Sequence, residues 1–126
     1  LCLIWQKIIE MSTGISIPAS AQIGHSFYIG HFGGIILNAK TTIGNNCNIS
    51  QGVTIGVSGQ GENRGVPKIG NNVYIGANVV IAGNITVEDG VLIGACSLVN
   101  TNVTANSVML GVPAVKVSEK GSEGYI

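Results

Sequence analysis

Charge is scarce in this sequence, and its scarcity excludes several classes of partner. Of the 126 residues, six are basic and six are acidic, so charged residues make up 10% of the chain, against roughly 25% in an ordinary soluble domain. Such a sparse and balanced charge offers no patch that would attract nucleic acid or an anionic membrane. No apolar run approaches the roughly 20 residues of a membrane-spanning helix. We therefore expect neither nucleic acid nor a membrane as a partner.

Cysteine is also rare. Cys2, Cys47 and Cys96 are far apart and match no metal-ligand spacing, so the sequence predicts neither a disulfide framework nor a metal site. Unpaired cysteines and the lack of a recognisable signal peptide favour a cytoplasmic protein. Whether residues precede Leu1 is left open. Hydrophobic residues nevertheless make up 45% of the chain and glycine occupies 19 positions, so the chain is too apolar for disorder.

The sequence contains an internal repeat with a period of six. An aliphatic residue recurs at every sixth position, often followed by glycine, and neither a helix nor a simple hairpin produces that period. The repeat changes phase between Ile35 and Leu37. Hexapeptide repeats form a parallel β-solenoid, in which three hexapeptides make one coil of a triangular prism. The repeated residues are Ile17, Ile23, Ile29, Ile35, Leu37, Ile43, Ile49, Ile55, Ile69, Ile75, Ile81, Val87, Ile93 and Val99.

Three segments lie outside the repeat domain or interrupt it. The repeat domain spans residues 14–117, and the glycine-rich residues 57–67 are predicted to form a loop outside the prism wall. That loop is either a tolerated insertion or a functional arm, and we favour the arm. Residues 1–13 are predicted to form a short helix that caps the open end of the prism, with membrane attachment as the alternative. The polar tail, 118–126, is predicted to be mobile.

Stacked coils bring four side chains into one column. With both interruptions allowed for, equivalent hexapeptides carry His31, Gln51, Ala77 and Ala95 at the same position. A titratable group, an amide and two very small side chains would form an open groove for a long, narrow ligand. His25 lies on a neighbouring side of the prism, and we expect no special role for it. Because the chain has two histidines, a three-histidine zinc site is excluded.

From Gly14 to about Lys116 the chain resembles the serine acetyltransferase branch of the hexapeptide acyltransferases. The resemblance implies an all-β fold, a single-stranded left-handed parallel β-helix with a short N-terminal helix and one extended loop. It also implies acetyl-CoA as co-substrate, no metal, and a homotrimer with active sites between subunits. The resemblance is carried by the loop, 57–67, and by five further segments. They are Gly14-Ile-Ser-Ile-Pro-Ala, His31-Phe-Gly-Gly-Ile, Gln51-Gly-Val-Thr-Ile-Gly, Pro67-Lys-Ile-Gly and Gly111-Val-Pro-Ala.

The resemblance also implies roles for individual residues. The family histidine at the position of His31 acts as general base, which suits a hydroxyl that must lose its proton as it attacks a thioester. Acetyl-CoA is implied to lie along the groove and under the loop. The implied cofactor-binding residues are Gly56, Ser58, Gly59, Ala77, Ala95 and Lys116. The implied acceptor-binding positions are Ser16, Gly30, Gln51 and Arg64.

The chain departs from the family where the acceptor binds. Serine acetyltransferases carry acidic residues at the positions of Ser16 and Gly30, and Arg-His where this chain has Gly65 and Val66. The carboxylate and ammonium groups of an amino acid need charged partners, and Arg64 is the remaining candidate. A neutral sugar hydroxyl needs none. We therefore expect a sugar or polysaccharide precursor as acceptor, as in the polysaccharide-associated O-acetyltransferases of this branch, with L-serine as the alternative.

Other interpretations were weighed. A catalytically inactive scaffold is the second alternative, because no carboxylate in the sequence is placed to orient His31. Glu62 of a neighbouring subunit or a backbone carbonyl could do so. A regular-surface binder would need long threonine ladders, and Thr41, Thr42 and Thr54 are too few. The galactoside and xenobiotic acetyltransferases keep their histidine near or after the loop, and no histidine follows His31 here, so that branch is disfavoured.

Overall fold

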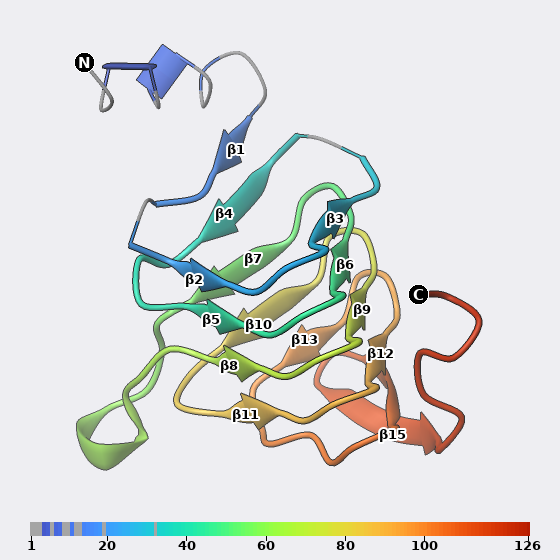
Figure 1. Ribbon diagram of the computed structural model, residues 1–126. Coiled ribbons are helices and arrows are strands. Elements are labelled where there is room, and N and C mark those ends of the chain that lie inside the picture. Colours follow the sequence, from blue (N-terminus) through green and yellow to red (C-terminus); the bar gives the residue numbers. More distant parts are fainter. Residues whose placement is uncertain (1–3, 6, 9–10, 12–13, 19, 32) are drawn as a thin grey trace.

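The fold is a triangular prism wound from one chain (Figure 1). The computed structural model describes residues 4–5, 7–8, 11, 14–18, 20–31 and 33–126. Short strands follow one another around the prism, and strands three places apart in the sequence pair side by side up to β13. The paired strands run parallel, except for the antiparallel pair of β14 and β15. The chain is a left-handed parallel β-helix, which confirms the predicted fold class.

Three sheets form the faces of the prism, and its corners are named A–B, B–C and C–A after the faces that they join. Face A consists of β1 (Ile15–Ser16), β4 (Ile35–Leu37), β7 (Thr54–Gly56), β10 (Val80–Ala82) and β13 (Leu98–Val99). Face B consists of β2 (Gln22–Ile23), β5 (Thr42–Ile43), β8 (Lys68–Ile69) and β11 (Thr86–Val87). Face C consists of β3 (Tyr28–Ile29), β6 (Asn48–Ile49), β9 (Tyr74–Ile75), β12 (Leu92–Ile93), β14 (Val108–Gly111) and β15 (Ala114–Ser118).

The repeated aliphatic residues fill the interior. On face C, Ile49, Ile75 and Ile93 pair in register and are fully buried. Each such side chain contributes about 1.5–3 kcal/mol when it is removed from water. The period of six follows from this geometry, because each side of a coil directs one aliphatic residue to the centre before the chain turns the next corner.

The B–C corner is stabilised by a ladder of side-chain hydrogen bonds. Asn71 Oδ1 accepts from the backbone N–H of Asn45, and Asp89 Oδ1 accepts from that of Asn71, both at 2.7 Å. The following residues, Asn46 and Asn72, have left-handed φ angles of 58° and 56°. Asparagine tolerates this conformation better than most residues. The asparagine pairs therefore turn the chain at this corner.

The phase change in the repeat widens the C–A corner. Ile29 pairs with Ile49, twenty residues later. The backbone N–H of Gly52 then donates to the carbonyl of Gly33 at 2.8 Å. This hydrogen bond is the one expected where paired residues are eighteen apart, as they are between β4 and β7. The two extra residues therefore lie between Ile29 and Gly33, and not between residues 35 and 37 as the sequence pattern suggested.

Residues 57–67 leave the prism at the A–B corner, as predicted, and form the projecting green loop in Figure 1. Two backbone hydrogen bonds, of 3.3 and 3.1 Å, join Ser58 and Gly65 at the base of the loop. Its tip is a short 3-10 helix, η1 (Gly61–Asn63). The loop is thus an ordered arm with a closed base.

The N-terminal segment is helical at the described positions between residues 4 and 11. The predicted cap over the open end of the prism is not found in these residues. Ile4, Trp5 and Met11 are 63%, 64% and 80% exposed, so their side chains do not cover the first coil. The described part of the chain contains no helix that is long and apolar enough to span a membrane.

The C-terminal segment, 118–126, packs against the prism, in contrast to the predicted mobile tail. Ser122 is buried, and its hydroxyl donates to the carbonyl of Asn72. The ring of Tyr125 lies against that of Tyr74, with centroids 5.6 Å apart. The polar composition of the tail suggested solvation, but some of these polar groups are satisfied by the prism.

Candidate active site

The column predicted from the repeat lies along the C–A corner. Gln51, Ala77 and Ala95 each follow a buried isoleucine of face C by two residues, on strands that pair in register. The carbonyl of Gln51 accepts from the N–H of Asn78 at 2.9 Å, and that of Ala77 from Cys96 at 2.8 Å. Consecutive members of the column are therefore about one strand spacing apart, ~4.8 Å. The two alanines leave the corner open above Gln51.

His31 lies at the N-terminal end of this column, on the widened corner. The corner is two residues longer here, and His31 is exposed. Gly33 and Gly34, with φ angles of 112° and 65°, adopt the backbone conformations that return the chain to face A and that glycine tolerates best. No hydrogen bond to the His31 ring is found within the described residues. The imidazole is thus exposed at this corner.

His25 has different surroundings. Its Nδ1 lies 3.2 Å from the hydroxyl of Ser26, and its backbone N–H donates to Asn45 Oδ1 at 3.0 Å. It lies at the B–C corner, across face C from His31. Among the described residues, no three His, Cys, Asp or Glu side chains come close enough together to hold a metal ion.

Gln51 carries an unsatisfied polar atom beside His31 in the column. Its Oε1 is buried, and no described residue donates a hydrogen bond to it. An unmatched buried acceptor costs about 1–3 kcal/mol, so such a group calls for a partner outside the described contacts, such as water or a ligand. The position of Gln51 is therefore compatible with the substrate contact predicted for it, which remains a prediction.

The loop residues predicted to contact the ligands are not at this corner. They lie at the A–B corner, at the other edge of face A, and Figure 1 shows the loop on the opposite side of the prism from the turns that follow β3, β6, β9 and β12. Within one chain, the structure therefore does not bring these residues to His31. They are Gly56, Ser58, Gly59 and Arg64.

Three further predicted residues are placed separately. Ser16 lies on β1, next to β4, the strand that follows the His31 corner. Gly30 precedes His31, and a Cβ there would be 3.7 Å from the ring of Tyr28. Lys116 lies on β15 with its Nζ 2.8 Å from the carboxylate of Glu119, and this hydrogen bond and ion pair lower the pKa of Glu119. Neither Ser16 nor Gly30 places a charge near the imidazole.

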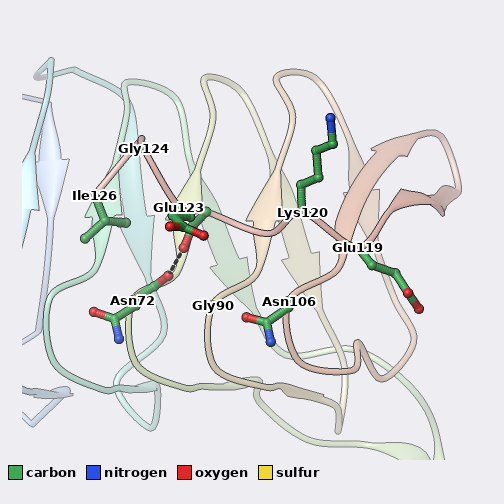
Figure 2. Close-up of a pocket in the computed structure, with 9 residues that line it drawn as sticks. Asn72, Gly90, Asn106, Glu119, Lys120, Glu123, Gly124 and Ile126 are labelled. Atoms are coloured by element: carbon green, nitrogen blue, oxygen red, sulfur yellow. Dashed lines mark hydrogen bonds between the residues drawn. The ribbon is translucent and has the colours of Figure 1, made fainter.

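A hollow of about 770 Å³ lies between the C-terminal tail and the B–C corner (Figure 2). Its walls include Asn72, Asn106 and Glu123, and none of the predicted site residues lines it. Figure 2 shows the dashed hydrogen bond that ties the tail to Asn72 at this place. The hollow is separated from His31 by the width of face C, so it is not part of the candidate active site.

Two residues that shape this region were not predicted. The side-chain amide of Asn84 donates to the carbonyl of Glu62 at 3.2 Å and so holds the loop to the next coil. Tyr28, 60% exposed, places its ring beside Gly30. Both residues occupy outward positions, where the repeat leaves the residue type free. The sequence therefore carried no signal for either one.

Comparison with known proteins places this geometry in a family. The bacterial transferase hexapeptide family (six repeats) matches residues 67–101. A serine acetyltransferase of Staphylococcus xylosus is 38% identical over 115 residues, which is 91% of this chain and 53% of that protein. A serine acetyltransferase of Staphylococcus epidermidis is 40% identical over 109 residues, 86% of this chain and 51% of that protein. The chain thus spans about half the length of the curated relatives it matches.

Solved structures agree with these relatives. The serine acetyltransferase of Brucella abortus strain S19 in complex with coenzyme A superposes with a TM-score of 0.86 at 32% identity, over 92% of this chain and 46% of that one. A serine acetyltransferase in complex with cysteine has a TM-score of 0.84 at 38% identity, over 92% of this chain and 48% of that one. The likeness therefore covers 92% of this chain in both structures.

Proposed function

Because the chain belongs to the hexapeptide-repeat family, in its serine acetyltransferase-like branch, we propose that it is an acetyl-CoA-dependent O-acetyltransferase. The observation that carries the proposal is the C–A corner, where an exposed His31 lies at the end of the column of Gln51, Ala77 and Ala95. The relative that contains coenzyme A supports acetyl-CoA as the co-substrate.

His31 supplies the base that this reaction needs. A hydroxyl is a weak nucleophile, so its proton must pass to the imidazole as the oxygen attacks the thioester carbonyl. The tetrahedral intermediate carries an oxyanion, which backbone N–H groups at the corner are suited to stabilise. When it collapses, the C–S bond breaks, the imidazolium returns its proton to the departing thiolate, and an acetyl ester and CoA are released. Imidazole titrates near neutrality and can perform both transfers.

The groove fits the narrow arm of acetyl-CoA. Ala77 and Ala95 carry single methyl groups, so an extended chain can approach the stacked backbone amides and carbonyls of the corner. The arm contains amide groups, which can bond to such a backbone and to the buried Oε1 of Gln51. The groove leads towards the end of the prism that carries Lys116, a cation that suits the phosphate groups of the cofactor.

A trimer would complete the site. The outward row of face A is uncharged and partly apolar, and such a surface is suited to burial between subunits. A head-to-tail contact of this kind closes into a ring and would bring the loop of one copy to the C–A corner of the next, so that Arg64 and Gly59 meet His31. The row consists of Ser16, Ile36, Thr54, Val80 and Leu98.

Two acceptors are supported by different observations. The relatives described above are serine acetyltransferases, which favours L-serine, and Arg64 from a neighbouring copy could bind its carboxylate. The uncharged Ser16 and Gly30 favour a neutral acceptor, the hydroxyl of a sugar, because neither position offers a partner for an ammonium group.

One set of measurements tests the proposal. We expect calorimetry to detect CoA binding, and release of free CoA thiol to accelerate when a suitable acceptor is added to acetyl-CoA. L-Serine and a panel of methyl pyranosides are compared side by side at equal concentrations. A protein that binds no CoA and releases no thiol with any acceptor would favour the inactive scaffold, and sedimentation velocity separately tests the trimer.

A further inference from the structure

We propose that Tyr28 forms an acceptor-binding platform beside His31, and that the acceptor it binds is a pyranose sugar. This inference deepens the proposed function and rests on it, because the platform acquires its role from the base next to it. It is carried by the position of Tyr28 on the outer surface of face C, two residues before Gly30.

The ring of Tyr28 is exposed and lies next to a gap. Tyr28 points outward from β3 and is 60% exposed, whereas the following Ile29 packs against the core. A Cβ at Gly30 would be 3.7 Å from Cε1 of Tyr28 and 3.7 Å from the carbonyl of Ile49, and no other described residue apart from its chain neighbours comes nearer. Because these are ordinary contact distances and φ at Gly30 is not positive, the backbone does not require glycine here. The missing side chain leaves space next to the ring of Tyr28, close to His31.

Comparison with Tyr74 shows that Tyr28 lacks a cover. Tyr28, Asn48 and Tyr74 form one outward row of face C in direct register. The tail covers the upper part of this row, since Tyr125 packs on Tyr74 and its carbonyl accepts from the side-chain amide of Asn48 at 3.2 Å. No aromatic partner of Tyr28 is found in the described residues. An exposed aromatic ring therefore remains below the docked tail, on the side of the row nearest His31.

The proposed function leaves this side for the acceptor. Acetyl-CoA would occupy the groove above His31, along Ala77 and Ala95, and a neighbouring subunit would cover face A. Face C, where Tyr28 and Gly30 lie, then offers the acceptor an approach to the imidazole. The hydroxyl that reacts would be directed to His31 while the rest of the acceptor rests on the ring.

The chemistry of the platform selects a sugar. One face of a pyranose presents C–H groups that pack on an aromatic ring, while its hydroxyl groups point outward and remain available for reaction. Tyrosine offers such a flat contact area with few rotatable bonds, and its hydroxyl can also bond to the ligand. The ammonium and carboxylate groups of serine would find no opposite charge on Tyr28 or Gly30.

Substitutions at Tyr28 and Gly30 test the platform. We expect Tyr28→Ala to raise the KM for the preferred methyl pyranoside about tenfold, the equivalent of one aromatic contact, and to leave the KM for acetyl-CoA unchanged. Tyr28→Phe and Tyr28→Trp should stay near wild type. Gly30→Leu, whose Cβ would make ordinary contacts, should also raise the acceptor KM, because it covers the ring without removing it. Gln22→Ala, on the outer surface of face B in the same coil, is the matched control.

Binding is also measured without turnover, by saturation-transfer NMR with the same methyl pyranosides. If the protein binds a pyranoside through Tyr28 but has no transferase activity, the platform is supported and the proposed function is rejected. Turnover with L-serine alone, or pyranoside kinetics unaffected by Tyr28→Ala and Gly30→Leu, would reject the platform and retain the acetyltransferase. If the protein binds neither CoA nor any pyranoside, both the platform and the proposed function are rejected.

Discussion

The backbone N–H of Gly52 donates a 2.8 Å hydrogen bond to the carbonyl oxygen of Gly33. The residues of β4, which follows this bond, pair with residues eighteen positions later, whereas the residues of β3 pair with residues twenty positions later. The two extra residues are therefore accommodated at the corner that carries His31. The exposed imidazole therefore lies on the lengthened part of this coil. The column beside it continues through the coils that follow, where alanines occupy the corner.

Replacing His31 with alanine should lower kcat by about 10²-fold or more, because general base catalysis typically contributes 10²–10⁴-fold. Its side chain is exposed, so the thermal unfolding transition should not change. Thiol release is measured with whichever acceptor the wild-type protein uses. His25→Ala, at the B–C corner, is the control and should keep full activity; equal activity in the His31 variant would remove this residue from the mechanism.

Enlarging Ala95 should block the cofactor groove. Ala95 is exposed at the C–A corner, so leucine can be placed there without disturbing the core, but its side chain would occupy the path of the pantetheine arm. We expect the Kd for CoA, measured by calorimetry, to rise about tenfold or more, a loss of ~1.4 kcal/mol. Ala105→Leu makes the same change at the exposed B–C corner. If both variants bind CoA equally well, the cofactor does not lie along the C–A corner.

Two glycine substitutions should differ sharply in stability. A Cβ at Gly44 would lie 2.3 Å from Asn71 Oδ1 and 2.7 Å from the carbonyl of Gly70, whereas a Cβ at Gly56 would meet nothing within 4 Å. Gly44→Ala should therefore lower the free energy of unfolding by about 1–3 kcal/mol through overpacking, and Gly56→Ala should have almost no effect. Urea denaturation measures both. Similar midpoints for the two variants would contradict the tight stacking of the B–C corner.

Removing the hydroxyl of Ser122 should release the C-terminal tail. The Ser122 hydroxyl donates to the carbonyl of Asn72 from a buried position, and loss of such a bond costs about 0.5–1.5 kcal/mol. We expect faster amide exchange over residues 119–126 in Ser122→Ala, with little change in the core strands. Glu123→Ala, at an exposed neighbouring position, should exchange like wild type. Unchanged protection of the tail would mean that other contacts hold it.

Much of the fold could be predicted because each repeated aliphatic residue occupies a packing position in the core. Ile49, Ile75 and Ile93 recur in the sequence for the reason that they stack in the core, and the small residues that follow them mark the C–A corner. The asparagine pairs were equally informative, since Asn46 and Asn72 adopt the left-handed conformation that a sharp corner needs. Periodicity thus specified the prism and most of the groove.

The amino-acid sequence by itself determined the prism, the order of its faces and the column of Gln51, Ala77 and Ala95, because each depends on a residue type repeated at a fixed spacing. Only the tertiary structure decided where the two extra residues lie, how the tail packs, and that the loop and His31 lie at opposite edges of face A. These features depend on contacts between coils, which involve residues such as Asn84 and Tyr28. Such pairs leave no period in the sequence, since each contact is made once.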